Sequence, residues 1–496
     1  MSYRAANTGP TRTPRMVVVS NRRPFTFKQG PDGPMLEKSA GGLVTALYPI
    51  LELTRGTWVA WDGAEAARGL EGTDSTRTLE SASKAAVRFV PVRLTHREVS
   101  RYYHGFSNRA LWPLSHLFIG RSHFAPSDYR EYERVNRKFA EATAEVSSPG
   151  DRIWVHDYHL TQVPEGLRAA NPNVGPIGYF WHIPFPPWDV FRVLPWKRQV
   201  LRGMLGADLI GFHLEDYAEH FRQSVQRCLG LERGDTEIFM ADGRRVRVGA
   251  FPIGIDVEKI EAVAASKLVR RREKQIRDRH GGRRILLSVD RLDYSKGILE
   301  RLMAIEYFFE RYPEYRGSVD FVQVAVPSRT RVEEYRFTKR HIEEAVGRIN
   351  GRFTDEGWMP IRYLYRSIPL HHLIAAYRAA DVALVTPLRD GMNLVAMEYV
   401  ASQAEARGAL VLSELAGVAG ILTGAFQVNP FDCAEVAAAI AEALGKPAPE
   451  LRRRMEAMRE QVREHDIFGW HERFWGALET REPGYTKTAF RALGRK

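Results

Sequence analysis

The sequence predicts an α/β protein made of two consecutive doubly wound domains, each with a parallel sheet. Short runs of Val, Ile, Leu and Phe alternate with longer segments of helical pattern along the chain. Continuous apolar runs are typical of strands buried on both faces of a parallel sheet, and their alternation with helices implies βαβ units. The chain has 496 residues, too many for one compact core, and the strand series is interrupted at 248–283. We therefore place a domain boundary near residue 254 and expect ligands at the carboxyl ends of both sets of strands.

The predicted strands fall into two series on either side of that boundary. Helices are expected between them at 130–145, 216–229, 298–311 and 434–444. The first series comprises 16–20, 57–61, 152–157, 177–183 and 208–213, and the second comprises 284–290, 319–326, 361–365, 382–387, 409–414 and 426–430.

The domain organisation that follows has four parts. Residues 1–15 are small and polar and are expected to form a disordered tail, followed by domains at 16–254 and 255–466. Residues 467–496 are expected to form a helix and tail, because the aromatic segment 468–479 is suited to packing back across the cleft onto the first domain.

Composition excludes several classes of protein. The chain is 44% hydrophobic and 27% charged, as in a folded globular protein, and no run reaches the roughly 20 apolar residues that a membrane helix needs. Two cysteines cannot build a disulfide framework and fit a reducing cytoplasm. The net charge of +12 comes mostly from arginines spread along the chain, which are densest at 268–284 and at the two ends. We interpret the run at 268–284 as a solvated surface rather than a nucleic-acid site, because no aromatic residues interleave with it.

Two motifs follow strands in the first domain. Arg22 in SNR ends a strand, and Gly41-Gly42 precedes a helical run, an arrangement that suits a phosphate or a simple tight turn. Asp157 in HDYHL also follows a strand, where it could orient a sugar hydroxyl or cap the next helix. Its flanking histidines lack an evident third ligand, which argues against a metal.

Another histidine comes at a strand end in the first domain. His182 in WHIPFPP precedes prolines that force an extended loop, which would present the imidazole to the cleft. A lone strand histidine is also often a satisfied core residue.

Two further motifs follow strands in the second domain. Arg291 and Lys296 in VDRLDYSKG are suited to a diphosphate that no metal neutralises, although they could be surface charges. In TPLRDGMNLVAMEYV, Asp390 could bind sugar hydroxyls, Glu398 could accept from a ribose diol, and the amides of Gly391, Met392, Asn393 and Leu394 could face sugar or phosphate.

In this order, the motifs SNR, GGL, HDYHL, HIPFP, RLDYSKG and PLRDGMNLVAMEY resemble those of the trehalose-6-phosphate synthase family of retaining glucosyltransferases. The resemblance covers about residues 16 to 478. It implies the GT-B fold, with two facing Rossmann-like domains and a C-terminal crossover helix. It also implies transfer of glucose from UDP-glucose to glucose 6-phosphate, with no metal and no cofactor.

The resemblance also implies a role for each matched residue. Arg291 and Lys296 would hold the donor diphosphate, His182 and Asp390 the glucosyl group, and Glu398 the ribose, with Gly42 and residues 391–394 completing the donor site. The acceptor would be held by Arg22, Trp61, Tyr103, Trp112, Asp157 and Arg329. Asp157, His182, Arg291, Lys296 and Asp390 are the expected catalytic residues.

Several alternatives stay open at the level of sequence. Arg23 and the long loop 25–38 depart from the family pattern near the acceptor lid, so glycerol 3-phosphate is an alternative acceptor. A catalytically dead sensing subunit and a donor carrying GDP or ADP are others. No phosphatase signature follows residue 480, so we expect a separate trehalose-6-phosphate phosphatase. We also expect a cytoplasmic homo-oligomer without nucleic-acid or membrane partners.

Overall fold

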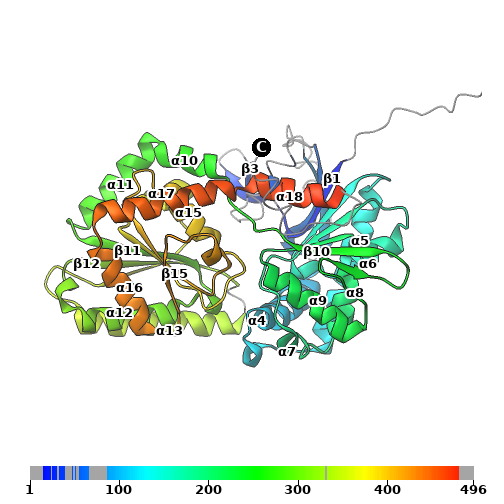
Figure 1. Ribbon diagram of the computed structural model, residues 1–496, viewed down its shortest axis with the longest axis horizontal. Helices are drawn as coiled ribbons and strands as arrows, with labels where there is room; N and C mark the ends of the chain where they lie inside the picture. The colour runs from blue at the N-terminus through cyan, green and yellow to red at the C-terminus, as the bar shows by residue number, and fades with distance from the viewer. Residues whose placement is uncertain are drawn as a thin grey trace, which may run out of the picture.

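The computed structural model describes residues 15–23, 25–30, 33–38, 47–48, 51, 55–65, 87–329 and 332–479. Within them, two separate sheets lie side by side, each flanked by helices (Figure 1). This arrangement is the GT-B architecture, which confirms the predicted fold class. The predicted tail at 1–14, Gly42 and residues 480–496 lie outside the described residues.

The first sheet has eight strands in the order β5-β4-β1-β6-β7-β8-β10-β9. All neighbouring strands are parallel except the β9–β10 pair at one edge. A hairpin of β2 (Phe25–Gly30) and β3 (Gly33–Lys38) follows β1. The strands of the sheet are β1 (Met16–Arg22), β4 (Thr57–Glu65), β5 (Arg88–Leu94), β6 (Arg152–His156), β7 (Ile177–Phe180), β8 (Leu209–Phe212), β9 (Glu237–Phe239) and β10 (Arg245–Ala250).

The second sheet has six strands, all parallel, in the order β13-β12-β11-β14-β15-β16. In both sheets the chain starts in the middle, builds outward to one edge and then crosses to build the other side. The strands are β11 (Arg284–Arg291), β12 (Val319–Val326), β13 (Ile361–Tyr365), β14 (Val382–Val385), β15 (Ala409–Ser413) and β16 (Phe426–Val428).

Helices cover both faces of the two sheets. Those of the first half are α3 (His96–Glu98), the π-helix η1 (Val99–Leu111), α4 (Trp112–Ser115), η2 (Ile119–Arg121), α5 (Pro126–Val146), η3 (Tyr158–Leu160), α6 (Val163–Ala170), α7 (Trp188–Phe191), α8 (Lys197–Met204) and α9 (Glu215–Leu229). Those that follow are α10 (Val257–Ala265), α11 (Lys267–Arg279), η4 (Tyr294–Lys296), α12 (Ile298–Arg311), η5 (Pro313–Tyr315), α13 (Glu333–Phe353), α14 (Leu370–Ala379), α15 (Leu394–Ser402), η6 (Gly417–Gly420), α16 (Cys433–Gly445), α17 (Ala448–Glu464) and α18 (Ile467–Glu479).

The predicted strands and helices are confirmed. The strands β2, β3 and β9 were not predicted, and three further differences have physical reasons. The strand predicted at 177–183 ends at Phe180, ahead of the proline-rich loop that begins at Pro184. The edge strand β5 was not predicted because it contains Pro91, and an edge strand tolerates a proline that a central strand does not. The strand β10 was not predicted either, because arginines interrupt its apolar pattern.

The chain passes between the two halves twice, and the two passages touch. The predicted boundary near residue 254 falls in the segment between β10 and α10. There the Ile467 amide donates to the Ile255 carbonyl at 3.0 Å. A Cβ on Gly254 would lie 1.5 Å from the His465 carbonyl oxygen, so only glycine fits. The passages therefore form one connection between the halves.

Helix α18 continues from α17 on the second half and packs against the first sheet (Figure 1). The Phe474 ring fills a notch made by two glycines, since a Cβ would lie 2.6 Å from the ring at Gly178 and 2.7 Å at Gly211. Trp470 packs nearby against Trp154 in a tilted arrangement, with ring centroids 4.9 Å apart. This is the docking predicted for the aromatic segment 468–479.

Among the described residues, none of the helices combines the length and the apolar character needed to cross a membrane.

Candidate active site

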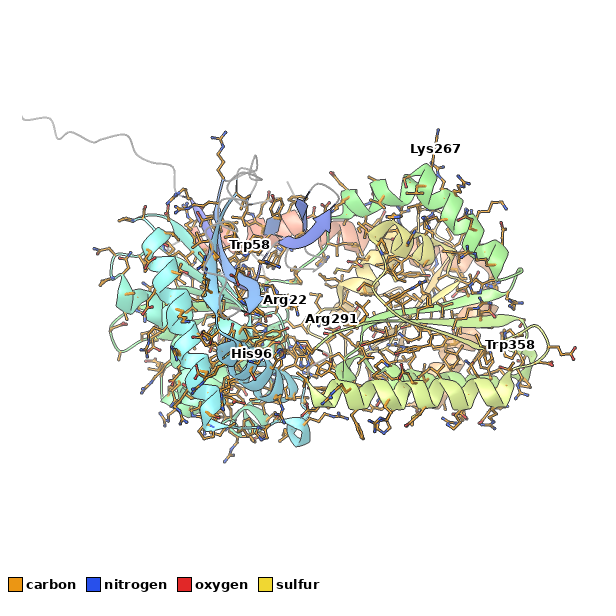
Figure 2. All side chains as sticks on the ribbon, turned by 180° about the vertical axis from the view of Figure 1, so that it is seen from behind. Arg22, Trp58, His96, Lys267, Arg291 and Trp358 are labelled. Atoms are coloured by element: carbon orange, nitrogen blue, oxygen red, sulfur yellow. The ribbon has the colours of Figure 1, made fainter. Side chains whose placement is uncertain are left out.

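The predicted site residues gather where the chain reverses direction in each sheet. In the first sheet, Arg22 ends β1 and Asp157 follows the adjacent strand β6. In the second, Arg291 ends β11 and Asp390 lies in the loop after the adjacent strand β14. Open α/β sheets bind ligands at this switch point, outside the carboxyl ends of the strands. Figure 2 shows Arg22 and Arg291 on the facing inner sides of the two halves, with Trp358 at the far outer end.

At the second sheet, two loops are joined by an ion pair. Lys296 Nζ and Asp390 Oδ2 lie 2.5 Å apart, and Asn393 Nδ2 donates to the same carboxylate oxygen at 2.9 Å. Burial acts to raise the pKa of Asp390, but the Lys296 ammonium outweighs it and lowers that pKa. Asn393 also caps α15 through the Ala396 amide. The structure thus brings together Lys296, Asp390 and Asn393 as predicted.

A buried arginine beneath these loops was not predicted. Arg301 is 1% exposed and pairs with Asp290 at 2.7 Å. Its other nitrogens donate to the Lys296 carbonyl at 3.0 Å and to the Thr386 hydroxyl at 2.9 Å, so one guanidinium joins both loops. The helical pattern of α12 gives no signal for this role, because an arginine in an amphipathic helix usually faces solvent.

The rest of the predicted donor segment lies around the start of α15. A Cβ on Gly391 would lie 2.8 Å from the His182 carbonyl oxygen, so this glycine allows the two halves to meet. Met392 is buried and Leu394 half-buried. Glu398 stands apart from the Lys296–Asp390 pair, with Tyr377 as its hydrogen-bond donor at 3.4 Å. Burial raises the pKa of Glu398 to about 7.

At the first sheet, Arg22 and Tyr103 form the centre of an aromatic cluster. Arg22 Nη2 donates to the Tyr103 hydroxyl at 2.9 Å, and the Trp61 and Tyr103 rings lie 6.0 Å apart. Burial opposes ionisation of Tyr103, but Arg22, Arg329 and Arg291 together lower the pKa of its phenol to about 8. Three cations around one phenol make a site suited to a phosphate dianion.

The cluster is completed by an arginine from the second half. The Arg329 guanidinium lies 3.9 Å above the Trp112 ring, and Arg291 lies 5.6 Å from the same ring. Arg329 Nη2 also donates to the Tyr158 hydroxyl at 3.1 Å. Five of the six predicted acceptor residues are therefore neighbours: Arg22, Trp61, Tyr103, Trp112 and Arg329. Tyr158, the tyrosine of HDYHL, joins them without having been predicted.

Asp157 occupies a strained position next to this cluster. Its φ is 78°, which is uncommon for a residue other than glycine and is a feature often found at functional sites. Its Oδ1 accepts from the Tyr158 amide at 3.0 Å, so the capping role left open by the sequence is present. Oδ2 lies 3.6 Å from His159 Nδ1. The carboxylate is one-fifth exposed and is free to take a second role at Oδ2.

His182 belongs to a group of three buried imidazoles. Its Nε2 is 3.0 Å from His156 Nδ1, and its ring lies 5.5 Å from that of His213. Burial lowers the pKa of His182 to about 4, so the ring is neutral at pH 7. Trp470 of α18 packs on the same group, with its ring 6.2 Å from that of His182. The crossover helix therefore contacts a predicted catalytic residue.

The remaining predictions concern metals and the basic run. In the parts of the chain that the structure describes, no three His, Cys, Asp or Glu side chains are placed to hold a metal ion. Several cations of 268–284 have partners: Lys274 pairs with Asp278, Arg283 with the buried Asp320, and Arg284 with Asp381.

Comparison with known proteins identifies the family. The model of glycosyltransferase family 20 matches residues 14–480. A trehalose-6-phosphate synthase of Mycobacterium marinum is 44% identical over 94% of this chain and 94% of its own length. A bifunctional trehalose-6-phosphate synthase/phosphatase of Thermoproteus tenax is also 44% identical, over 92% of this chain, which spans 62% of that longer protein.

Solved structures of related proteins support the same family assignment. An α,α-trehalose-phosphate synthase (UDP-forming) of Burkholderia xenovorans, in complex with glucose-6-phosphate, superposes with a TM-score of 0.84 at 35% identity, covering 94% of this chain and all of its own. The E. coli protein bound with UDP-2-fluoro glucose gives a TM-score of 0.84 at 34% identity, covering 95% of this chain and all of its own. The predicted family and enzyme class are confirmed: the chain belongs to glycosyltransferase family 20 and is a glycosyltransferase.

Proposed function

We propose that the chain transfers glucose from UDP-glucose to glucose 6-phosphate, with retention at the anomeric carbon, and forms trehalose 6-phosphate and UDP. The observation that carries this is the pairing of two unlike clusters across the cleft. Lys296, Asp390 and Glu398 suit a nucleotide sugar, and Arg22, Tyr103 and Arg329 suit a phosphorylated acceptor. The complexes of the two relatives with glucose-6-phosphate and UDP-2-fluoro glucose support this assignment.

In the donor site, Arg291 and Lys296 bind the diphosphate. The Lys296 ammonium has three donors, so it can hold Asp390 and still donate to a phosphate oxygen. Asp390 and the neutral His182 bind glucosyl hydroxyls, and Glu398 accepts from the ribose diol. Donors already placed before the reaction stabilise the charge that develops on the leaving group, and losing one costs about 100-fold or more in rate.

Transfer then proceeds on one face of the sugar. The bond from the anomeric carbon to the β-phosphate oxygen breaks, and a bond to the acceptor hydroxyl forms from the same side. The acceptor proton passes to the departing phosphate oxygen, so charge and atoms balance without an enzymic nucleophile. Asp157 orients the acceptor and stabilises positive charge near the anomeric carbon. Holding the acceptor in this orientation lowers the activation barrier, because the acceptor has already lost its translational and rotational freedom before the transfer step.

The acceptor site distinguishes a hexose phosphate from a smaller alcohol. The Arg22, Tyr103 and Arg329 groups hold the phosphate, and the aromatic walls of Trp61 and Trp112 are suited to the apolar face of a sugar ring. Glycerol 3-phosphate would satisfy the cations and leave the aromatic walls without a partner.

The test is a comparison of acceptors with the purified protein. UDP release from UDP-glucose is measured with glucose 6-phosphate and, separately, with glycerol 3-phosphate. We expect turnover with glucose 6-phosphate. Turnover with glycerol 3-phosphate alone would contradict the proposal, and GDP-glucose and ADP-glucose in the same assay determine the nucleotide preference. A cytoplasmic location and a separate phosphatase that consumes the product accompany this proposal.

A further inference from the structure

A buried carboxylate lies between the two clusters and belongs to neither. Asp293 is 1% exposed and sits between Arg291 and Lys296 in the donor loop. Its Oδ1 accepts from the Ser295 amide at 3.1 Å. Its Oδ2 accepts from Arg329 Nη1 at 3.0 Å and from the Tyr335 hydroxyl at 2.8 Å. One oxygen therefore binds the donor loop, and the other binds an acceptor arginine.

The arginines around Asp293 keep its carboxylate ionised, and the carboxylate in turn holds the Arg329 side chain in place. Burial alone would raise the pKa of Asp293, but Arg329 and Arg291 lower it to about 2. The Arg329 backbone has a φ of 45°, so its side chain leaves a strained turn and needs an anchor. Asp293 and the Tyr335 hydroxyl both accept from Nη1, and the Tyr158 hydroxyl accepts from Nη2. Arg329 Nε is buried and has no hydrogen-bond partner among the described residues, which leaves it available to an anion.

We propose that Asp293 is a positioning residue that orients Arg329 toward the acceptor phosphate and ties it to the loop that holds the donor diphosphate. The inference rests on the proposed acceptor role of Arg329. It explains why the acceptor cluster of the first half includes an arginine from the second half. A carboxylate that only stabilised the fold would not need to bond to both substrate-binding segments.

The variant Asp293→Asn separates these two bonds. The amide oxygen of asparagine still accepts from the Ser295 amide, so the donor loop keeps its shape. The amide nitrogen faces Arg329 and Tyr335, which both donate to Asp293, so Arg329 loses its charged anchor and keeps only the neutral hydroxyls of Tyr335 and Tyr158. Removing a hydrogen bond to a charged group lowers affinity by roughly 10- to 100-fold. We expect the KM for glucose 6-phosphate to rise by about that factor, with the Kd of UDP little changed.

Asp320→Asn is the matched control. Asp320 is also fully buried, accepts from His280 and Arg283, and stands at the opposite end of β12 from the cleft. The Asp320→Asn variant should have a lower melting temperature and an unchanged KM for glucose 6-phosphate. Tyr335→Phe is the second variant, because it removes both a donor to Asp293 and a neutral acceptor for Arg329 Nη1, and it buries no new charge. It should raise the same KM by a smaller factor.

The outcomes are distinct. A rise in the KM for glucose 6-phosphate in the order Asp293→Asn, Tyr335→Phe, Asp320→Asn supports the inference. Equal weakening of glucose 6-phosphate and UDP, no change, or the same effect in Asp320→Asn would overturn it. If Asp293→Asn does not fold, an unchanged KM in Tyr335→Phe overturns it and a raised KM supports it. Absence of turnover with glucose 6-phosphate in the unmodified protein contradicts the proposed function itself.

Discussion

The two switch points of this molecule are built in different ways. At the second sheet, Lys296, Asp390 and the buried Arg301 beneath them all belong to one half: Lys296 pairs with Asp390, and Arg301 donates to the Lys296 carbonyl. At the first sheet, Arg22 and Tyr103 belong to one half, and Arg329 comes from the other. The ion pair at the centre of the donor site therefore forms within one half, although His182 of the first half is also assigned to the glucosyl group, whereas the acceptor cluster forms only where the halves meet. We therefore expect a shift in the relative position of the two halves to weaken acceptor binding more than donor binding.

The largest effect is expected from the donor cluster. Lys296→Ala removes a cation from the diphosphate and leaves the buried Asp390 without its partner, so kcat should fall by about 100-fold or more. Lys274→Ala is the control, because Lys274 pairs with Asp278 on the exposed surface of α11. Steady-state rates of UDP release measure both. Unchanged turnover in Lys296→Ala would mean that the diphosphate is held elsewhere.

The next effect concerns the acceptor cluster alone. Arg22→Ala removes a charged donor from the phosphate site, so the KM for glucose 6-phosphate should rise by roughly 10- to 100-fold. The KM for UDP-glucose should stay close to its original value, because Arg22 lies at the first sheet. Arg97→Ala, which removes a largely exposed arginine paired with Glu131, is the control. A parallel rise in both KM values would break the distinction between the clusters.

A third prediction concerns the helix that joins the halves. Gly178→Ala places a methyl group 2.6 Å from the Phe474 ring, which displaces α18 from the first sheet. Overpacking of this kind lowers the free energy of unfolding by about 1–3 kcal/mol. The KM values for glucose 6-phosphate and for UDP-glucose should both rise, because α18 packs on the half that carries Arg22 and its Trp470 contacts His182 of the donor site.

Gly476→Ala on the same helix is the control, because a Cβ there meets no described atom within 4 Å. It should leave both KM values unchanged and raise the melting temperature, since alanine favours a helix by about 1 kcal/mol over glycine. If Gly178→Ala and Gly476→Ala changed the KM values equally, the packing of Phe474 in the glycine notch would not be what couples α18 to substrate binding.

A smaller effect is expected from pH. Glu398 has a pKa of about 7, so it is largely protonated at pH 6 and ionised at pH 8. The carboxylate is the better acceptor for a ribose diol, so the Kd of UDP-glucose, which has no terminal phosphate to titrate near pH 7, should fall as pH rises through 7. The folded pKa lies above the unfolded value, so ionisation of this group destabilises the folded state as pH rises. Titration calorimetry with Glu398→Gln should show the pH dependence removed, and a dependence that persists would assign it to another group.

The smallest effect is expected from chelation of metals. Arg291 and Lys296 supply the positive charge that a divalent cation would otherwise bring to the diphosphate. We therefore expect dialysis against EDTA to leave turnover unchanged. Loss of activity that is restored by Mg²⁺ or Mn²⁺ would show that these two cations are not sufficient.

The donor cluster was more predictable from sequence than the acceptor cluster, for physical reasons. Lys296 and Asp390 each stand in a loop directly after a buried strand, so strand order alone brings them together. Tyr103 lies on a π-helix that no periodicity predicts, and the family resemblance was needed to include it. Asp293 and Arg301 were not predicted because their roles depend on tertiary contacts of buried charges. Gly42 lies outside the described residues, so its role stays a prediction.

The central claim is that the two facing clusters carry out a retaining transfer between two phosphorylated substrates. The most direct test is the NMR spectrum of the product formed from UDP-glucose and glucose 6-phosphate. We expect a disaccharide phosphate with both anomeric protons in the α configuration, formed with one equivalent of UDP. A β-configured glucosyl group, or UDP release with no disaccharide phosphate, would contradict it.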